Sequence, residues 1–221
     1  MPFWGKLFLL IFGLVFLFLG VTLGIFGAAG ARAEAARAEA LAPLTAAALD
    51  DKAPGETALV EGTLSTRNPA LFRDYVAYTV EEYRGQKSNS SEPRWEREEK
   101  VTPPLLVEAG GIVRVANDDY RIAGQLNNWQ ESQVLSWNSI TNEGTKRYAG
   151  LVAGQVVTAI GAVVAGAEGN ELQAEVVFGG TRAQYIESQH QSAFWLPIIG
   201  GIFGVIGLSV AGAGTWLLLR R

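Results

Sequence analysis

The sequence predicts a membrane α-helical hairpin, in which two transmembrane helices flank a mainly antiparallel β domain. Charge-free apolar runs cover 7–31 and 192–219, and each exceeds the roughly 20 residues that a helix needs to cross a hydrocarbon core. Between them the apolar positions repeat every second residue, and turn-forming residues recur at short intervals, as in a domain of short strands. We expect four segments: a transmembrane helix at 1–31, an alanine-rich helical linker at 32–53, the β domain at 54–188, and a second transmembrane helix with a basic C-terminus at 189–221.

The length of the first apolar run favours a retained anchor over a signal peptide, whose apolar core covers about 7–15 residues. The small residues Ala31 and Ala33 keep cleavage open as the alternative. Lys6 precedes the first run, and Arg220 and Arg221 follow the second, so positive charge gathers at the two termini. Because positively charged flanks stay in the cytoplasm, we expect both termini there. The β domain is then expected on the opposite side, which is extracytoplasmic in a prokaryote.

Glycines recur at four-residue intervals in both apolar runs. Small residues at this spacing let two helix backbones approach closely, so that van der Waals contacts hold the helices together in lipid. Glycine is also common in membrane helices generally, so the alternative is that these glycines reflect composition and make no helix contact. We expect helix packing, within the chain or between copies, at five positions, namely Gly20, Gly24, Gly200, Gly204 and Gly207.

The β domain is expected to begin with two long strands at 57–64 and 75–83, which are rich in β-branched and aromatic residues. A polar hairpin loop at 85–93 then leads to a return strand at 94–101. Shorter apolar segments predict further strands at 105–107, 112–115, 133–135, 156–164 and 172–178, of which 156–164 is the most apolar and is expected to lie centrally. Many short strands separated by turns are typical of a small barrel, OB-like in form, or of a sandwich.

Aromatic side chains are the best candidates for a binding surface, because tryptophan and tyrosine are enriched at interface hot spots. Tyr78 and Trp95 lie in expected strands, and we expect these two rings to fill the barrel core instead. Trp129 and Trp137 lie in the polar stretch 125–142, where a core is less obvious. We predict that these two tryptophans contact a partner.

The composition excludes several kinds of site. Cysteine is absent, so no disulfide, thiolate metal site or thiol nucleophile is available. His190 is the single histidine and lies beside the second apolar run, where a polar residue is expected without catalysis. Acidic residues on neighbouring strands, such as Glu82 and Glu96, are expected to form cross-strand charge pairs with arginines. Residues 51–193 hold 13 Lys and Arg against 19 Asp and Glu, which disfavours nucleic acid as a partner. We expect no catalytic residue, cofactor or metal.

Several short motifs follow one another in a recognisable order, namely Val60-Glu61-Gly62-Thr63-Leu64, Asp74-Tyr75-Val76-Ala77-Tyr78, Glu81-Glu82-Tyr83, Trp95, Pro104, Gly111-Ile112-Val113-Arg114-Val115, the strand at 156–161 and Glu187-Ser188. This order, over most of 56–219, resembles the beside-a-membrane domain of the GIDE-type proteins, a family that includes a mitochondrial outer-membrane ubiquitin ligase. The resemblance implies a membrane-bound β domain that binds partners or substrates. The ligases of the family carry a RING finger with eight Cys and His zinc ligands. This sequence has no cysteine, so ligase activity is not expected.

These features predict a non-enzymatic membrane-anchored protein whose β domain binds a protein partner, as an accessory subunit of a membrane complex. The main alternative is a self-assembling membrane organiser, which forms homo-oligomers through its helices. A ubiquitin-ligase-like protein or a membrane-bound hydrolase is a weaker alternative, because no nucleophile–base pair or metal constellation stands out in the sequence. The expected partners are the lipid bilayer and either a protein or a second copy.

Overall fold

The computed structural model describes residues 2–86, 93–132, 136–137, 140–141 and 144–220. The chain divides into two compact units, a helical one of residues Met1–Ala40 and Ile186–Arg221 and a β unit of residues Leu41–Tyr185. The boundaries between the units therefore fall after Ala40 and after Tyr185.

Two long apolar helices make up the helical unit, which includes the second of them from Ile186 onward. The first runs over Phe3–Ala40 as α1 (Phe3–Val21), the π-helical turn η1 (Thr22–Gly27) and α2 (Ala28–Ala40), and the second is α4 (Arg182–Leu219). Each covers 38 residues, or about 57 Å at 1.5 Å per residue. Both are long and apolar enough to span a membrane.

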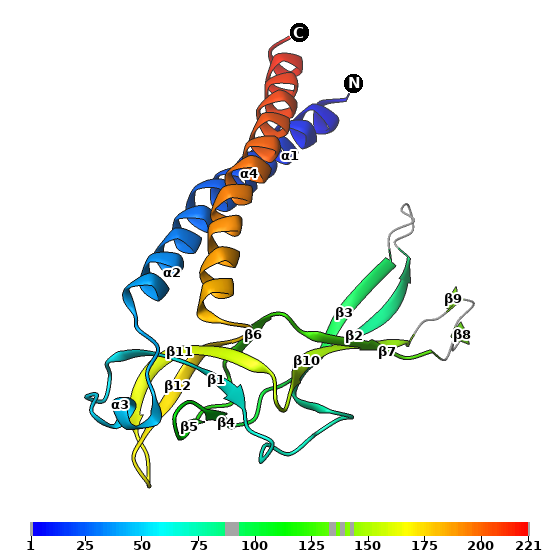
Figure 1. Ribbon diagram of the computed structural model, residues 1–221. Coiled ribbons are helices and arrows are strands. Elements are labelled where there is room, and N and C mark those ends of the chain that lie inside the picture. The colour runs from blue at the N-terminus through cyan, green and yellow to red at the C-terminus, as the bar shows by residue number, and fades with distance from the viewer. Residues whose placement is uncertain (1, 87–92, 133–135, 138–139, 142–143, 221) are drawn as a thin grey trace. The chain divides into compact units, whose positions relative to one another are not determined.

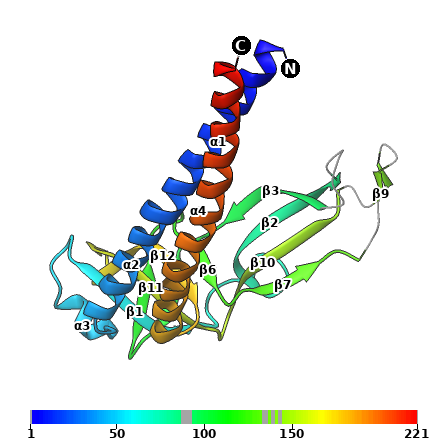
Figure 2. The same ribbon diagram turned by 90° about the horizontal axis from the view of Figure 1, so that it is seen from above.

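The two helices lie side by side, with both chain ends at the same end of the pair (Figures 1 and 2). Lys6 Nζ donates a hydrogen bond to the Arg220 carbonyl oxygen at 3.4 Å. Many large apolar side chains on both helices face outward, for example Phe8, Phe18 and Val205, which are 64%, 69% and 66% exposed. A helix in the core of a soluble protein would bury such side chains.

The helix α4 begins earlier than its hydropathy predicts. We expected the second helical segment to begin at 189, whereas α4 begins at Arg182. The Thr181 Oγ1 accepts a hydrogen bond from the Gln184 amide at 3.3 Å, and the Thr181 amide donates to Gln184 Oε1 at 2.9 Å. This reciprocal capping box starts the helix within a polar sequence.

Five strands of the β unit close into a barrel. These are β1 (Thr57–Leu64), β4 (Leu105–Glu108), β5 (Ile112–Val115), β12 (Asn170–Gly179) and β11 (Val156–Ala165), paired in that order with β11 returning to β1. Four of the pairings are antiparallel, and β5 pairs with β12 in parallel. The strand β6 (Arg121–Gly124) adds to β12 in parallel. The domain is therefore mainly antiparallel and contains a closed barrel, which was one of the two expected forms.

The barrel holds the main apolar core. Its inward side chains include Val60, Leu105 and Val177, each at most 1% exposed. The short helix α3 (Ala46–Asp50) contributes Leu49 to the same cluster. The strand β11, expected to be central, pairs along both edges, with β1 and with β12.

A second sheet has four strands in the order β3-β2-β10-β7. Its strands β2 (Tyr75–Gln86) and β3 (Pro93–Val101) come from the chain between β1 and β4, whereas β7 (Asn127–Gln130) and β10 (Lys146–Val152) come from the chain between β5 and β11. Two insertions into the barrel thus pair with each other (Figure 1). The strands β8 (Ser136–Trp137) and β9 (Ile140–Thr141) pair antiparallel in a separate two-stranded sheet, and the strand expected at 133–135 lies outside the described residues.

The expectation that Tyr78 and Trp95 fill the barrel core is wrong. Both lie on the four-stranded sheet, on β2 and β3, and both are half-buried. The sequence pattern of these strands resembles that of a barrel strand, because either kind alternates between an inner and an outer face. The sheet to which a strand belongs depends on its pairing partners, which lie far away in the sequence.

Candidate functional site

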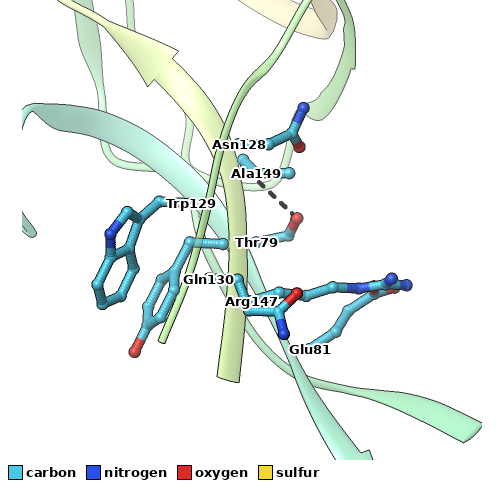
Figure 3. Close-up of a pocket in the computed structure, with 8 residues that line it drawn as sticks. Thr79, Glu81, Asn128, Trp129, Gln130, Arg147 and Ala149 are labelled. Carbon is cyan, nitrogen blue, oxygen red and sulfur yellow. Dashed lines mark hydrogen bonds and ion pairs between the residues drawn. The ribbon is translucent and has the colours of Figure 1, made fainter. Parts of the chain in front are cut away.

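The four-stranded sheet presents two chemically different faces. Residues that pair directly across strands share a face, so Gln130, Arg147 and Glu81 form one row across β7, β10 and β2. The next row contains Trp129, Tyr148 and Val80 and faces the opposite way. Figure 3 shows the Trp129 ring on one side of the strands and the side chains of Glu81 and Arg147 on the other. We call these sides the aromatic face and the polar face.

The aromatic face carries a cluster of five rings, namely Phe72, Tyr75, Tyr78, Trp129 and Tyr148. The Phe72 and Tyr148 rings stack with their centroids 4.3 Å apart, and the Trp129 centroid lies 5.4 Å from Tyr148 and 5.7 Å from Phe72. Burial raises the pKa of Tyr75, Tyr78 and Tyr148 above the ordinary tyrosine value, so these phenols are neutral at physiological pH. Trp129 is half-buried and lies at the margin of the cluster, on the outermost strand.

Arg73 places a cation over this margin. Its guanidinium carbon lies 4.5 Å from the centroid of the Trp129 ring. Arg73 has a φ of 49°, the one positive φ of a non-glycine residue among the described parts of the chain. The tight turn around it is closed by the Tyr75 amide, which donates to the Phe72 carbonyl at 2.9 Å. Such a conformation costs on the order of 1 kcal/mol or more, and residues of this kind cluster at functional sites.

The polar face is organised by Arg147. Its Nε and Nη2 both lie 2.6 Å from Glu81 Oε2, and its Cζ lies 4.2 Å from the centroid of the Trp95 ring. Thr79 Oγ1 donates to the Ala149 carbonyl at 3.3 Å. An open pocket of about 460 Å³ is lined mostly by residues of this face, namely Thr79, Glu81, Asn128, Gln130, Arg147 and Ala149, together with Trp129 and Tyr148 of the opposite row (Figure 3).

The expected cross-strand charge pairs are confirmed between β2 and β3 and between β10 and β3. Arg84 Nε on β2 lies 3.6 Å from Glu96 Oε2 on β3, whereas the contact of Arg84 Nη1 with Glu82 Oε1 at 2.8 Å lies within β2. Lys146 Nζ lies 2.8 Å from Glu98 Oε2, and this hydrogen bond raises the pKa of Lys146. The acidic side chains here are paired with cations, as on a solvated structural surface.

Much of this site was not predicted from the sequence, because β10 was not expected as a strand. Its sequence contains Gly150, and glycine weakens a strand prediction. A Cβ at Gly150 would lie 2.5 Å from the Ala77 carbonyl oxygen, so the glycine permits close contact with β2. The residues Phe72, Arg73, Arg147 and Tyr148 were missed. The one local signal for β10 was the strand propensity of Tyr148 and Val152.

Of the two tryptophans predicted to bind a partner, the structure describes one fully. Trp129 lies on β7, where Arg73 and the aromatic cluster hold its ring. Trp137 lies in β8, and its side chain is outside the described part of the structure. Partner contact by these residues stays a prediction.

The glycines proposed for helix packing lie in different surroundings. A Cβ on Gly20 would come 2.6 Å from the Gly200 carbonyl oxygen, and one on Gly200 would come 2.5 Å from the Gly20 carbonyl oxygen. A Cβ on Gly207 would lie 2.4 Å from the Leu17 amide nitrogen, and one on Gly24 would make an ordinary 3.4 Å contact. A Cβ on Gly204 would meet nothing within 4 Å.

Among the described residues, no group of three or more His, Asp or Glu side chains is close enough together to hold a metal ion. His190 belongs to the helical unit, where its Nε2 lies 2.8 Å from Glu39 Oε1 and the side chain is exposed. It is therefore not part of the polar or the aromatic face.

Comparisons of the chain with protein-family models, with curated proteins and with solved structures found no significant match. No relative thus supplies a ligand, a reaction or a set of site residues for transfer. The two faces of the four-stranded sheet are the features from which a function can be inferred.

Proposed function

We propose that this protein is a two-pass membrane protein without enzymatic activity, whose β domain binds a partner protein as an accessory subunit of a membrane complex. One observation carries the proposal. The four-stranded sheet displays a half-buried tryptophan, flanked by an arginine and by further rings, at its open margin. Aromatic residues and arginine are the side chains most enriched in protein interfaces and their hot spots.

The helical unit supports membrane attachment with both termini on one side. The outward apolar side chains of α1 and α4 suit a lipid environment. The approach of Lys6 to Arg220 brings the two basic ends together, and positively charged flanks favour the cytoplasm. The β domain would then lie on the other side of the membrane.

The chemistry of the polar face favours binding over catalysis. A hydrolase needs a nucleophile with an adjacent base, or carboxylates free to accept a proton. In the pocket, Glu81 is engaged by Arg147 and Thr79 donates to a backbone carbonyl. These contacts hold the side chains in place without activating any of them.

The barrel supports an interpretation as an OB-like scaffold. Counted in chain order, its strands pair as first, second, third, fifth and fourth, and the fourth returns to the first. A five-stranded Greek-key barrel is the OB architecture. We extend the proposal to the resemblance with the GIDE-type membrane domain, with the two barrel insertions as the partner-binding part and without the RING-dependent ligase activity of that family.

The main alternative, a self-assembling organiser, depends on helix surfaces that a second copy can use. Gly20 and Gly200 already contact each other within one chain, as Gly207 contacts Leu17. Side chains at these positions would collide with the neighbouring helix of the same chain. Packing within the chain therefore uses these glycines, which favours a binding protein over a helix-mediated assembly.

The test is affinity purification of the full chain from native membranes in mild detergent, followed by mass spectrometry. We expect one stoichiometric partner protein that is lost in Trp129→Ala and retained in Ile112→Ala. Ile112 is a matched control, because it is an exposed apolar residue on the barrel strand β5. A ladder of self-assemblies without a foreign protein would contradict the proposal and favour the organiser.

A further inference from the structure

We propose that the basic side chains at the paired ends of α1 and α4 bind the phosphate of an anionic phospholipid. This inference rests on the membrane attachment in the proposed function, and it adds a site in the helical unit together with the class of its ligand. Four features support it: two cations that meet from the two helices, the distance of the acidic residues from them, their depth relative to the tryptophans, and an aromatic ridge beside them.

Two basic side chains meet where α1 begins and α4 ends. Lys6 Nζ donates one hydrogen bond, to the Arg220 carbonyl oxygen at 3.4 Å, and an ammonium group has three donors. The Arg220 Cζ lies 4.6 Å from the centroid of the exposed Trp216 ring. This stacking uses the face of the guanidinium, so its in-plane N–H groups can pair with phosphate oxygens. In the described part of the chain these N–H groups have no acceptor. The two cations can therefore bind one anion together.

The acidic residues of both helices lie far from this pair of cations. The first acidic residue after Lys6 is Glu34, and the last one before Arg220 is Glu187. At 1.5 Å per residue, these carboxylates lie about 42 Å and about 50 Å away along their helices. Because both chain ends lie at the same end of the helix pair (Figures 1 and 2), the acidic residues gather toward the opposite end. Both distances far exceed the Debye length of about 8 Å, so the positive charge is available to an external anion.

Tryptophans place the two cations at the level of the lipid headgroups. Trp195 and Trp216 of α4 are both exposed and are separated by about 32 Å of helix, close to the roughly 30 Å of a hydrocarbon core. Because tryptophan is enriched at both membrane interfaces, these two rings mark where α4 enters and leaves the hydrocarbon. Arg220 follows Trp216 by one helical turn. On α1, the exposed Trp4 lies in the same turn as Lys6.

An aromatic ridge beside the cations favours a lipid over a free phosphate ion. Trp4, Phe8, Phe12 and Phe16 follow one another at four-residue intervals, so they share one face of α1. The ring centroids are 5.8 Å apart between Phe8 and Phe12 and 4.7 Å apart between Phe12 and Phe16. The ridge begins beside Lys6 and runs toward the middle of the apolar run. A phospholipid can place its phosphate on the cations and its acyl chains along the ridge, whereas inorganic phosphate can use only the cations.

The probe is phosphatidylglycerol, and its control is phosphatidylcholine with the same acyl chains. Both lipids carry a phosphate, but the choline cation of the control is repelled by the two basic side chains. Each lipid is titrated into the full chain in detergent, and native mass spectrometry measures the bound fraction. A basic residue near an anionic lipid surface contributes about fivefold in affinity, so we expect phosphatidylglycerol to bind at least about tenfold more tightly.

Equal affinity of the two lipids would overturn the inference, and this comparison needs no variant. Inorganic phosphate in large molar excess should leave phosphatidylglycerol bound. Displacement of the lipid by phosphate would assign the cations to a free anion and overturn the lipid site.

The decisive variants are Arg220→Gln and the double variant Lys6→Gln with Arg220→Gln. We expect Arg220→Gln to lower the affinity for phosphatidylglycerol about fivefold and the double variant to lower it at least about tenfold. The matched control is Arg32→Gln, which removes the same charge from an exposed position on α2 and should bind normally. Unchanged binding by the double variant, or an equal loss in Arg32→Gln, would overturn the inference.

Extraction of native membranes with alkaline carbonate separates this inference from the proposed function. If the chain stays in the washed membranes and binds the two lipids equally, the inference fails while the two-pass membrane protein stands. If carbonate releases the chain, it does not span the membrane, and both fail. If phosphatidylglycerol is preferred but no partner protein purifies with the chain, the lipid site stands and the proposed binding of a partner fails.

Discussion

The barrel and the four-stranded sheet are made from alternating parts of one chain, yet they bury different side chains. The barrel has closed on itself, and its inward strand positions are mainly aliphatic and buried, as Leu105 and Val107 illustrate. Among the described residues the outer sides of β3 and β7 have no partner strand, and the cluster on this sheet consists mainly of aromatic rings around Tyr148, several of them only half-buried. Closure removes edges that could pair with other chains. The difference indicates that the barrel supplies stability and that the sheet supplies the binding surface.

The largest effect is expected in the barrel. Leu105→Ala removes a side chain that is 1% exposed and leaves a cavity in the apolar cluster. We expect the free energy of unfolding to fall by about 3 kcal/mol. Urea titration of the full chain in detergent, followed by tryptophan fluorescence, measures it. A loss below about 1 kcal/mol would mean that the barrel is not the stable part of the domain.

A smaller effect is expected in the sheet. Trp129 is half-buried at the margin of its cluster, so Trp129→Ala should lower the free energy of unfolding by only about 1–2 kcal/mol. The same urea titration, followed by circular dichroism, measures the change. A loss as large as that of Leu105→Ala would show that the cluster and the barrel core unfold together, and the distinction between the two parts would fail.

The sequence predicted the barrel better than the sheet. The strands at 57–64, 105–107, 112–115, 156–164 and 172–178 correspond to β1, β4, β5, β11 and β12. These strands are rich in β-branched and other apolar side chains, which local sequence reports well. The sheet depends on pairing between two distant insertions, and β10 is interrupted by Gly150. No sequence rule indicates that Arg73 adopts a positive φ, because its turn is held by Phe72 and Tyr75.

Alkaline pH should loosen the aromatic cluster. Burial raises the pKa of Tyr78 and Tyr148 above the ordinary tyrosine value of 10.0, so the folded state holds these protons more tightly than the unfolded state. The stability they contribute is fully present below the unfolded pKa and is lost as pH rises through the raised folded pKa.

The measurement is the urea midpoint at about pH 8 and at about pH 10.5, where tyrosine ionises in the unfolded state. Tyr148→Phe cannot ionise and should lose less stability between these pH values. Burial also raises the pKa of Tyr120 in the barrel core. Tyr120→Phe is therefore the matched variant that tests the same effect in the barrel. Identical midpoints for the unchanged protein at both pH values would contradict this expectation.

The smallest effect on stability is expected for Arg73→Gly, which should nevertheless abolish binding. Glycine adopts a positive φ without strain, which stabilises the turn by on the order of 1 kcal/mol. Loss of the cation over Trp129 costs about 0.5–1 kcal/mol at such an exposed site, so the two changes offset each other. The urea midpoint should hardly move, while the partner no longer purifies with the chain.

Arg73→Lys keeps a cation and the strain, and it should bind more weakly than the unchanged protein yet better than Arg73→Gly. If Arg73→Gly retains the partner at full stoichiometry, Arg73 serves only the turn, and the binding surface of the sheet does not include it.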